Sequence, residues 1–123
     1  MSGRQKYVGM KYVVSAYENS EIPDPFWIDE GGFDSPDDAI RCAEGIIDRS
    51  LSGFFEPGMS AETLRMSYLC YGEVPTIFND EGLNFETYRH VYRRIRELTG
   101  ESEWKPKSYG KESAKDGASE SST

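Results

Sequence analysis

Residues 56–78 read EPGMSAETLRMSYLCYGEVPTIF, and this stretch sets where a helix gives way to a strand. Ser60 stands at an N-cap position, since its side-chain oxygen can accept a hydrogen bond from a free amide of the first turn. Leu64, Tyr68 and Tyr71 come next at spacings of four and three, which is typical of one apolar helix face. The stretch therefore predicts a helix that begins after Ser60.

The second half of the same stretch predicts where that helix ends and where a strand begins. Gly72 is expected to be a left-handed C-cap, because glycine adopts positive φ without steric cost. Pro75 cannot continue a helix and begins the extended run PTIF, so we expect a third strand of at most five residues. Residues 79–82, NDEG, are typical of a turn.

Two further helices are predicted on either side of this stretch. Residues 33–51, FDSPDDAIRCAEGIIDRSL, carry Ser35 as N-cap and Pro36 as first helical residue. Residues 85–98, FETYRHVYRRIREL, are expected to be capped by Asn84 and ended by Gly100. The apolar faces expected for these two helices comprise Ile40, Ala43, Ile47 and Leu51 in the first, and Phe85, Tyr88, Tyr92, Ile95 and Leu98 in the second.

The amino-terminal part of the chain predicts two antiparallel strands. Residues 7–17, YVGMKYVVSAY, alternate in the manner of a half-buried strand, and residues 26–33, FWIDEGGF, form a second strand ended by Gly31 and Gly32. The predicted fold class is α+β, with a small antiparallel sheet of about three strands against about three helices in the order β-β-α-α-β-α. Residues 1–100 are expected to form one domain, and 101–123, rich in Ser, Lys and Glu, a disordered tail.

Charge is distributed unevenly along the 123 residues, whose net charge is −8. Residues 18–48 hold ten acidic residues against Arg41 alone, whereas 85–99 hold four arginines against two glutamates. The acidic balance disfavours non-specific binding to nucleic acid or anionic membrane. No signal peptide or membrane span is predicted, and two cysteines without a disulfide framework are typical of a reducing compartment, so we expect a cytoplasmic protein.

The sequence shows little catalytic machinery. His90 is the single histidine, Cys42 and Cys70 are 28 residues apart, and no metal-ligand spacing occurs, so no cofactor or metal is predicted. A dyad of Cys70 with His90 requires the fold to bring them together. We expect Cys70 instead to be a small buried hydrophobe late in its helix.

The chain resembles a family of small, uncharacterised bacterial cytoplasmic proteins over about residues 26–96. The shared pattern is an FDS-type helix start, a GMSAE helix start and a GExP turn. It comprises Phe33, Asp34, Ser35, Ala39, Ile40, Ile47, Asp48, Leu51, Gly58, Met59, Ser60, Ala61, Glu62, Leu64, Tyr68, Gly72, Glu73, Pro75, Ile77 and Phe85. The chain departs from the pattern at residues 85–95, FETYRHVYRRI, where a small residue and a tryptophan are expected. The resemblance implies a fold and a compartment, but no activity.

The leading functional prediction is a non-enzymatic protein-interaction or regulatory module with a protein partner. Its candidate binding residues are Tyr88, Arg89, Tyr92, Arg93 and Arg96 on the last helix and Glu21, Asp24, Asp29 and Glu30 in the acidic segment. The simpler interpretation is that the arginines of the last helix pair with the acidic residues of 18–48 or with Glu86 and Glu97. Two alternatives stay open: a small-molecule-binding protein or minor enzyme with a pocket lined by Tyr12, Tyr68 and Tyr71, and an acidic inhibitor of a nucleic-acid-binding protein.

Overall fold

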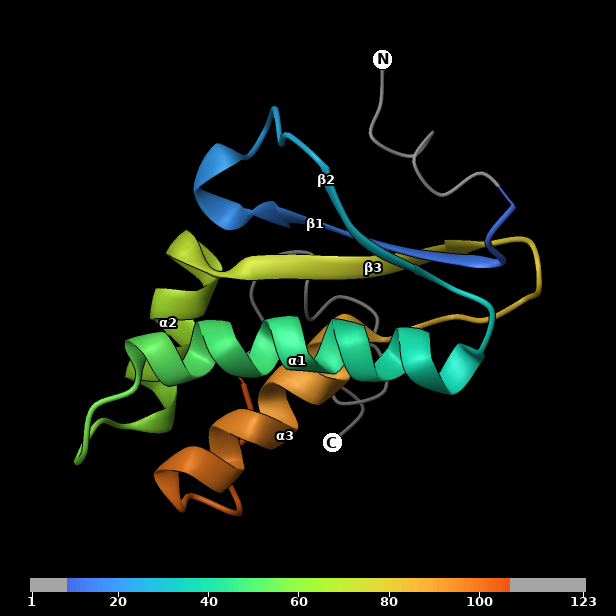
Figure 1. Cartoon of the computed structure of the whole chain (residues 1–123). Helices are drawn as coiled ribbons and strands as arrows, with labels where there is room; N and C mark the ends of the chain where they lie inside the picture. Colours follow the sequence, from blue (N-terminus) through green and yellow to red (C-terminus); the bar gives the residue numbers. More distant parts are fainter. Residues whose placement is uncertain (1–8, 107–123) are drawn as a thin grey trace, which may run out of the picture.

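Three antiparallel strands and three α-helices make up the part of the chain that the computed structural model describes, residues 9–106 (Figure 1). The elements are β1 (Tyr12–Glu18), the short 3-10 helix η2 (Asn19–Glu21), β2 (Ile28–Phe33), α1 (Pro36–Phe54), α2 (Ala61–Tyr71), β3 (Glu73–Asn79) and α3 (Thr87–Thr99). This α+β class and the order β-β-α-α-β-α confirm the prediction.

The sheet has the strand order β2-β1-β3, with β1 in the centre. β1 pairs with β3 along its whole length, from Tyr12 opposite Asn79 to Glu18 opposite Glu73. Its pairing with β2 shifts register between Val14 and Ser15, where β2 carries one extra residue. Such a bulge bends an edge strand and increases its twist.

One face of the sheet packs on α1, as Figure 1 shows. The side chains that alternate along β1 toward this face meet the first half of α1, as periodicity predicts. The cluster comprises Tyr12, Val14, Ala16, Ala39, Ala43, Ile46 and Ile77. α1 therefore serves as the main cover of the sheet.

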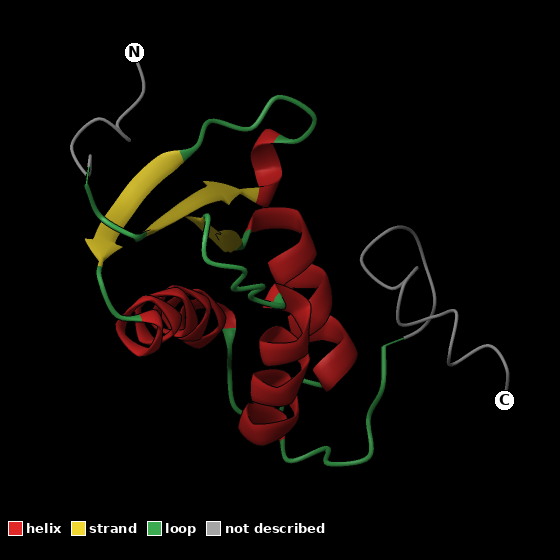
Figure 2. Cartoon of the chain, turned by 90° about the vertical axis from the view of Figure 1, so that its right-hand side faces the viewer, coloured by secondary structure: helices red, strands yellow, loops and turns green. Residues whose placement is uncertain are grey.

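The three α-helices pack beside one another (Figure 2), and a second cluster of buried residues lies between them and the start of β3. It joins the later half of α1 to α2 and α3, and comprises Ile47, Leu51, Ala61, Leu64, Tyr68, Val74, Val91, Tyr92 and Ile95. Tyr88 stacks edge-on against Tyr68 and lies tilted against Tyr92. The Tyr88 and Tyr92 rings of α3 therefore pack against other residues of the fold.

Two strand predictions are corrected by the structure. Gly31 and Gly32 do not end β2, because they pair with Val14 and Val13 inside the strand. A Cβ at Gly31 would lie 2.9 Å from the Phe33 ring, so a close side chain favours glycine there. β3 has seven residues rather than at most five, since its pairing begins at Glu73, before the proline.

The end of α2 also differs from the prediction. Gly72 has φ −72° and ψ 159°, which is extended backbone and not a left-handed cap. A Cβ at Gly72 would lie 2.3 Å from Cδ1 of Tyr68. Glycine is required at this position by the close approach of a buried ring, and not by a positive φ.

Three further predictions about the helices are wrong. Tyr71 is 63% exposed, and the fully buried Arg65 takes a place on the buried face of α2. Cys70 is exposed and free. α3 begins at Thr87 with Glu86 as N-cap and no side-chain capping bond, so Asn84 does not cap it. By contrast, Gly100 has φ 76° and ends α3 as predicted.

The residues that come after α3 lie against the domain. Trp104 packs edge-on against Tyr92, and a Glu101 carboxylate oxygen accepts a hydrogen bond from the Ala61 amide at 2.9 Å. The remainder of the predicted tail, 107–123, lies outside the described residues. Within the described range, no helix is both long enough and apolar enough to cross a membrane.

Candidate functional site

The arginines of α3 are mostly engaged with acidic residues close to them. Arg94 Nε donates to Asp48 Oδ1 at 3.1 Å, and Arg94 Nη1 donates to Glu97. Arg89 pairs with Glu86 at 2.8 Å on the helix surface. Arg93 Nη2 lies 3.9 Å from Glu44, on α1. Arginines of α3 therefore pair with acidic residues of 18–48 at the α1–α3 contact, in agreement with the simpler interpretation of the charge asymmetry.

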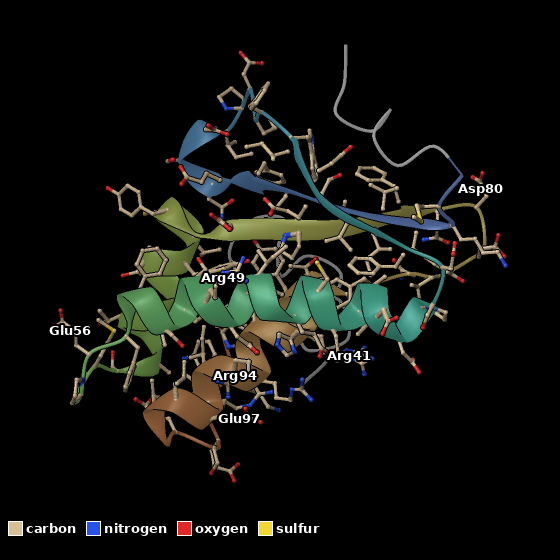
Figure 3. The ribbon with its side chains drawn as sticks, in the orientation of Figure 1. Arg41, Arg49, Glu56, Asp80, Arg94 and Glu97 are labelled. Atoms are coloured by element: carbon tan, nitrogen blue, oxygen red, sulfur yellow. The ribbon has the colours of Figure 1, made fainter. Side chains whose placement is uncertain are left out.

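Arg94 and Glu97 lie side by side on α3, below α1 in Figure 3. Their hydrogen bond raises the pKa of the Arg94 guanidinium and lowers the pKa of the Glu97 carboxyl. Glu97 is about half exposed, so solvent screens this pair and it contributes little to stability. Arg96 points elsewhere and donates to the Trp104 carbonyl at 3.4 Å.

His90 stands at the centre of the α1–α3 contact, with 7% of its surface exposed. Its Nε2 lies 2.9 Å from Asp48 Oδ1, and its Nδ1 lies 2.6 Å from Arg93 Nη2. A guanidinium can only donate, so Nδ1 must accept and the proton must reside on Nε2. Asp48 and Arg93 therefore orient the imidazole, and Glu44 Oε2 lies 3.6 Å from its Nδ1. Neither ring nitrogen is left for Cys70, so the structure does not assemble the Cys–His dyad.

A hollow of about 350 Å³ opens beside His90. The segment 83–86 and the first turns of α3 line it on one side, and Ile40 and Glu44 of α1 on the other. Ile40, Leu83 and Phe85 are partly buried and belong to the edge of the core under the sheet. The hollow therefore combines apolar walls with charged groups from α3.

The three tyrosines of the predicted pocket are not brought together. Tyr12 is buried under the sheet opposite Asn79, whereas the Tyr68 hydroxyl donates to the Glu73 carbonyl at the other end of β3. These two ends are separated by the length of the strand, which is roughly 20 Å. Burial strongly raises the pKa of Tyr68, and Tyr71 is exposed. The hollow beside His90 contains none of the three.

The acidic segment 21–30 lies at the surface and carries exposed apolar side chains. Phe26 is 70% exposed, Ile22 53% and Ile28 52%. Glu21 Oε1 accepts a hydrogen bond from the Phe26 amide, which folds the segment back on itself. Among residues 9–106, Glu21, Asp24, Asp29 and Glu30 take part in no ion pair.

Trp27 covers the sheet face opposite α1. Its ring lies edge-on to Tyr17 at 4.7 Å and to Phe78 at 5.6 Å between centroids. Ser15 lies on the same face as Tyr17, two residues earlier in β1; it is fully buried and its hydroxyl donates to Asp29. Burial also raises the pKa of Tyr17. Asp29 is therefore partly a structural residue, whereas Glu21, Asp24 and Glu30 are exposed.

Comparison with known proteins gives no assignment. No family model, curated protein or solved structure matches the chain. The family resemblance therefore remains a prediction. Within the described residues, no group of three or more His, Cys, Asp or Glu side chains is placed to hold a metal ion.

Sequence reasoning missed two features of these surfaces. Phe26 and Ile22 are not among the predicted binding residues, although two apolar residues in an acidic loop with two prolines are a recognisable signal. The role of His90 also escaped prediction. Its signal is the spacing of Glu44 and Asp48, four residues apart on one helix, which places both carboxylates on one face.

Proposed function

We propose that the protein is a non-enzymatic protein-interaction module that binds a basic partner through the segment 21–30. The observation that carries the proposal is the exposure of Phe26 among carboxylates that no described cation neutralises. Exposed aromatic residues are common anchors of protein interfaces. Carboxylates around such an anchor accelerate association with a positively charged surface.

The contacts that α3 makes within the fold favour the segment 21–30 over α3 as the partner surface. Tyr92 is buried, Tyr88 packs against it, and Arg94 is bonded to Asp48 of α1. A partner that used these residues would have to replace contacts within the fold. The segment 21–30 requires no such replacement at Glu21, Asp24 and Glu30, which are exposed, or at its most exposed apolar side chains.

The test compares capture of partners by the full chain and by charge-reversed variants. Asp24→Lys with Glu30→Lys is expected to slow association with a captured basic protein at least about tenfold at low salt, an order of magnitude typical of electrostatic steering. Phe26→Ala is expected to weaken the same complex by increasing its dissociation rate. Both are measured by surface plasmon resonance.

Glu56→Lys with Asp80→Lys is the matched control, because both carboxylates are exposed and lie away from the segment (Figure 3). This pair changes the net charge equally and is expected to slow association much less. Equal effects of the two pairs would reject the segment as the binding surface. Competition by duplex DNA for the same partner would identify an inhibitor of a nucleic-acid-binding protein.

A further inference from the structure

Hydrogen bonds within the protein hold one wall of the hollow beside His90 in place. Asn79 holds the loop that forms one wall: its Oδ1 accepts from the amides of Glu81 and Leu83, and its Nδ2 donates to the Leu83 carbonyl. Thr87 Oγ1 donates to the Pro75 carbonyl at 2.8 Å and ties the start of α3 to β3. Because these bonds already order the wall, a ligand can bind there with little further loss of conformational entropy.

Arg93 presents a guanidinium at this hollow whose charge is only partly neutralised. Its short hydrogen bond goes to the imidazole of His90, whereas the nearest Glu44 oxygen is 3.9 Å away. The side chain is 55% exposed. A guanidinium has five N–H donors, so Arg93 can keep its bond to His90 and still donate to a ligand.

Arg89 adds a second guanidinium one helical turn earlier. Residues four apart on a helix lie on the same face, which places Arg89 beside Arg93 along the hollow. Its side chain is 79% exposed and paired with Glu86 on the same surface. Exposed pairs of this kind contribute at most about 1 kcal/mol, so a ligand can replace Glu86 at small cost.

Two carboxylates that line the hollow, those of Glu44 and Glu86, disfavour an anion, and both lie near an arginine that offsets their charge. Glu44 is 34% exposed, and its Oε2 lies near both His90 and Arg93. Glu86 is already paired with Arg89. A ligand that enters from solvent can reach both guanidinium groups, since the Arg89 and Arg93 side chains are 79% and 55% exposed. The apolar side chains of Ile40, Leu83 and Phe85 line the same hollow.

We propose that this hollow is a binding site for a small oxyanion, either a carboxylate or a phosphate monoester, that carries an apolar group. The oxyanion lies between Arg89 and Arg93, since guanidinium groups match the geometry of both anions. The apolar group lies against Ile40, Leu83 and Phe85. A volume of about 350 Å³ suits a ligand of this size. This site is independent of the proposed partner surface at residues 21–30.

Phenyl phosphate, benzoate, benzylamine and inorganic phosphate are the probes, each titrated into the full chain and followed by backbone amide chemical shifts. Saturable changes are expected for phenyl phosphate or benzoate at residues 40, 44, 83–86 and 89–93. The stronger of these two probes identifies the anion. Inorganic phosphate is expected to bind several-fold more weakly, because it lacks the apolar group.

Arg93→Gln tests the assignment without removing the donor to His90, since the glutamine amide can still donate to Nδ1. It is expected to weaken binding of the better probe at least about tenfold, the effect of losing one charge-assisted hydrogen bond. Arg93→Lys keeps the charge but loses the planar fork and is expected to recover part of the affinity. Arg49→Gln is the matched control, because Arg49 is exposed on α1 and does not line the hollow.

Three results would overturn the proposal. The first is no saturable binding of either organic anion up to about 20 mM, well above a millimolar Kd. The second is equal binding of benzylamine or of inorganic phosphate. The third is an equal loss of affinity in Arg49→Gln and in Arg93→Gln, each checked by its spectrum to be folded.

Discussion

Gly72 lies directly against the Tyr68 ring at the junction of α2 and β3. The Tyr68 ring is fully buried, and its hydroxyl donates to the Glu73 carbonyl at 2.6 Å, so the ring is held at both ends. The space where a Cβ of residue 72 would stand is occupied by that ring. A side chain at residue 72 must therefore displace a core residue or move the start of β3.

Gly72→Ala is expected to lower the free energy of unfolding by about 1–3 kcal/mol, the usual cost of overpacking a core. Gly45→Ala is the opposite control. Gly45 lies within α1, and a Cβ there meets nothing within 4 Å. That change is expected to stabilise the protein by about 0.5–1 kcal/mol, because alanine loses less backbone entropy in a helix. Urea unfolding measures the change in unfolding free energy for each variant. A change of the same sign in both variants would contradict the prediction.

At the scale of the elements, the segment after α3 closes a contact with the start of α2. The amide of Ala61 in the first turn of α2 donates to Glu101, forty residues later in the chain. Ser60 satisfies a different amide of the same turn, that of Thr63. Two side chains from distant parts of the sequence thus share the capping of one helix, and the negative charge of Glu101 also suits the positive end of the helix dipole.

Glu101→Gln is expected to lower the free energy of unfolding by about 0.5–1 kcal/mol, because an amide oxygen accepts less strongly and carries no charge for the dipole. Glu103→Gln removes the same charge two residues later, at an exposed position outside this contact. It is expected to change stability by less than about 0.5 kcal/mol. The two midpoints in urea, measured side by side, check the assignment, and a Glu103 effect as large as that of Glu101 would refute it.

Elements governed by local chemistry were predictable from the sequence. Ser35 and Ser60 cap their helices as expected, because an N-cap needs one oxygen and the next few residues. The role of Gly72 was not predictable, since it depends on where the Tyr68 ring lies. The α1–α3 site was missed for the same reason: Asp48 and His90 are 42 residues apart and meet only in the folded chain.

On the scale of the whole molecule, the two faces of the sheet are covered very differently. α1 buries one face with a row of aliphatic side chains. The other face bears no α-helix from the described residues (Figure 2). On that face the Trp27 ring lies edge-on to Tyr17 and to Phe78. The residue that stabilises this face and the residue proposed to bind a partner, Phe26, are therefore neighbours in the chain. If both assignments are right, a change at Trp27 lowers stability, whereas a change at Phe26 weakens partner binding and leaves stability nearly unchanged.

Trp27→Ala is expected to lower the free energy of unfolding by about 2 kcal/mol, less than the loss of a fully buried tryptophan because 40% of the residue is exposed. Phe26→Ala is expected to change stability by less than about 0.5 kcal/mol while weakening partner binding. Urea unfolding and binding are measured on both variants. If Phe26→Ala destabilises the fold as much as Trp27→Ala does, Phe26 is a structural residue, and the exposed aromatic anchor on which the partner surface depends does not exist.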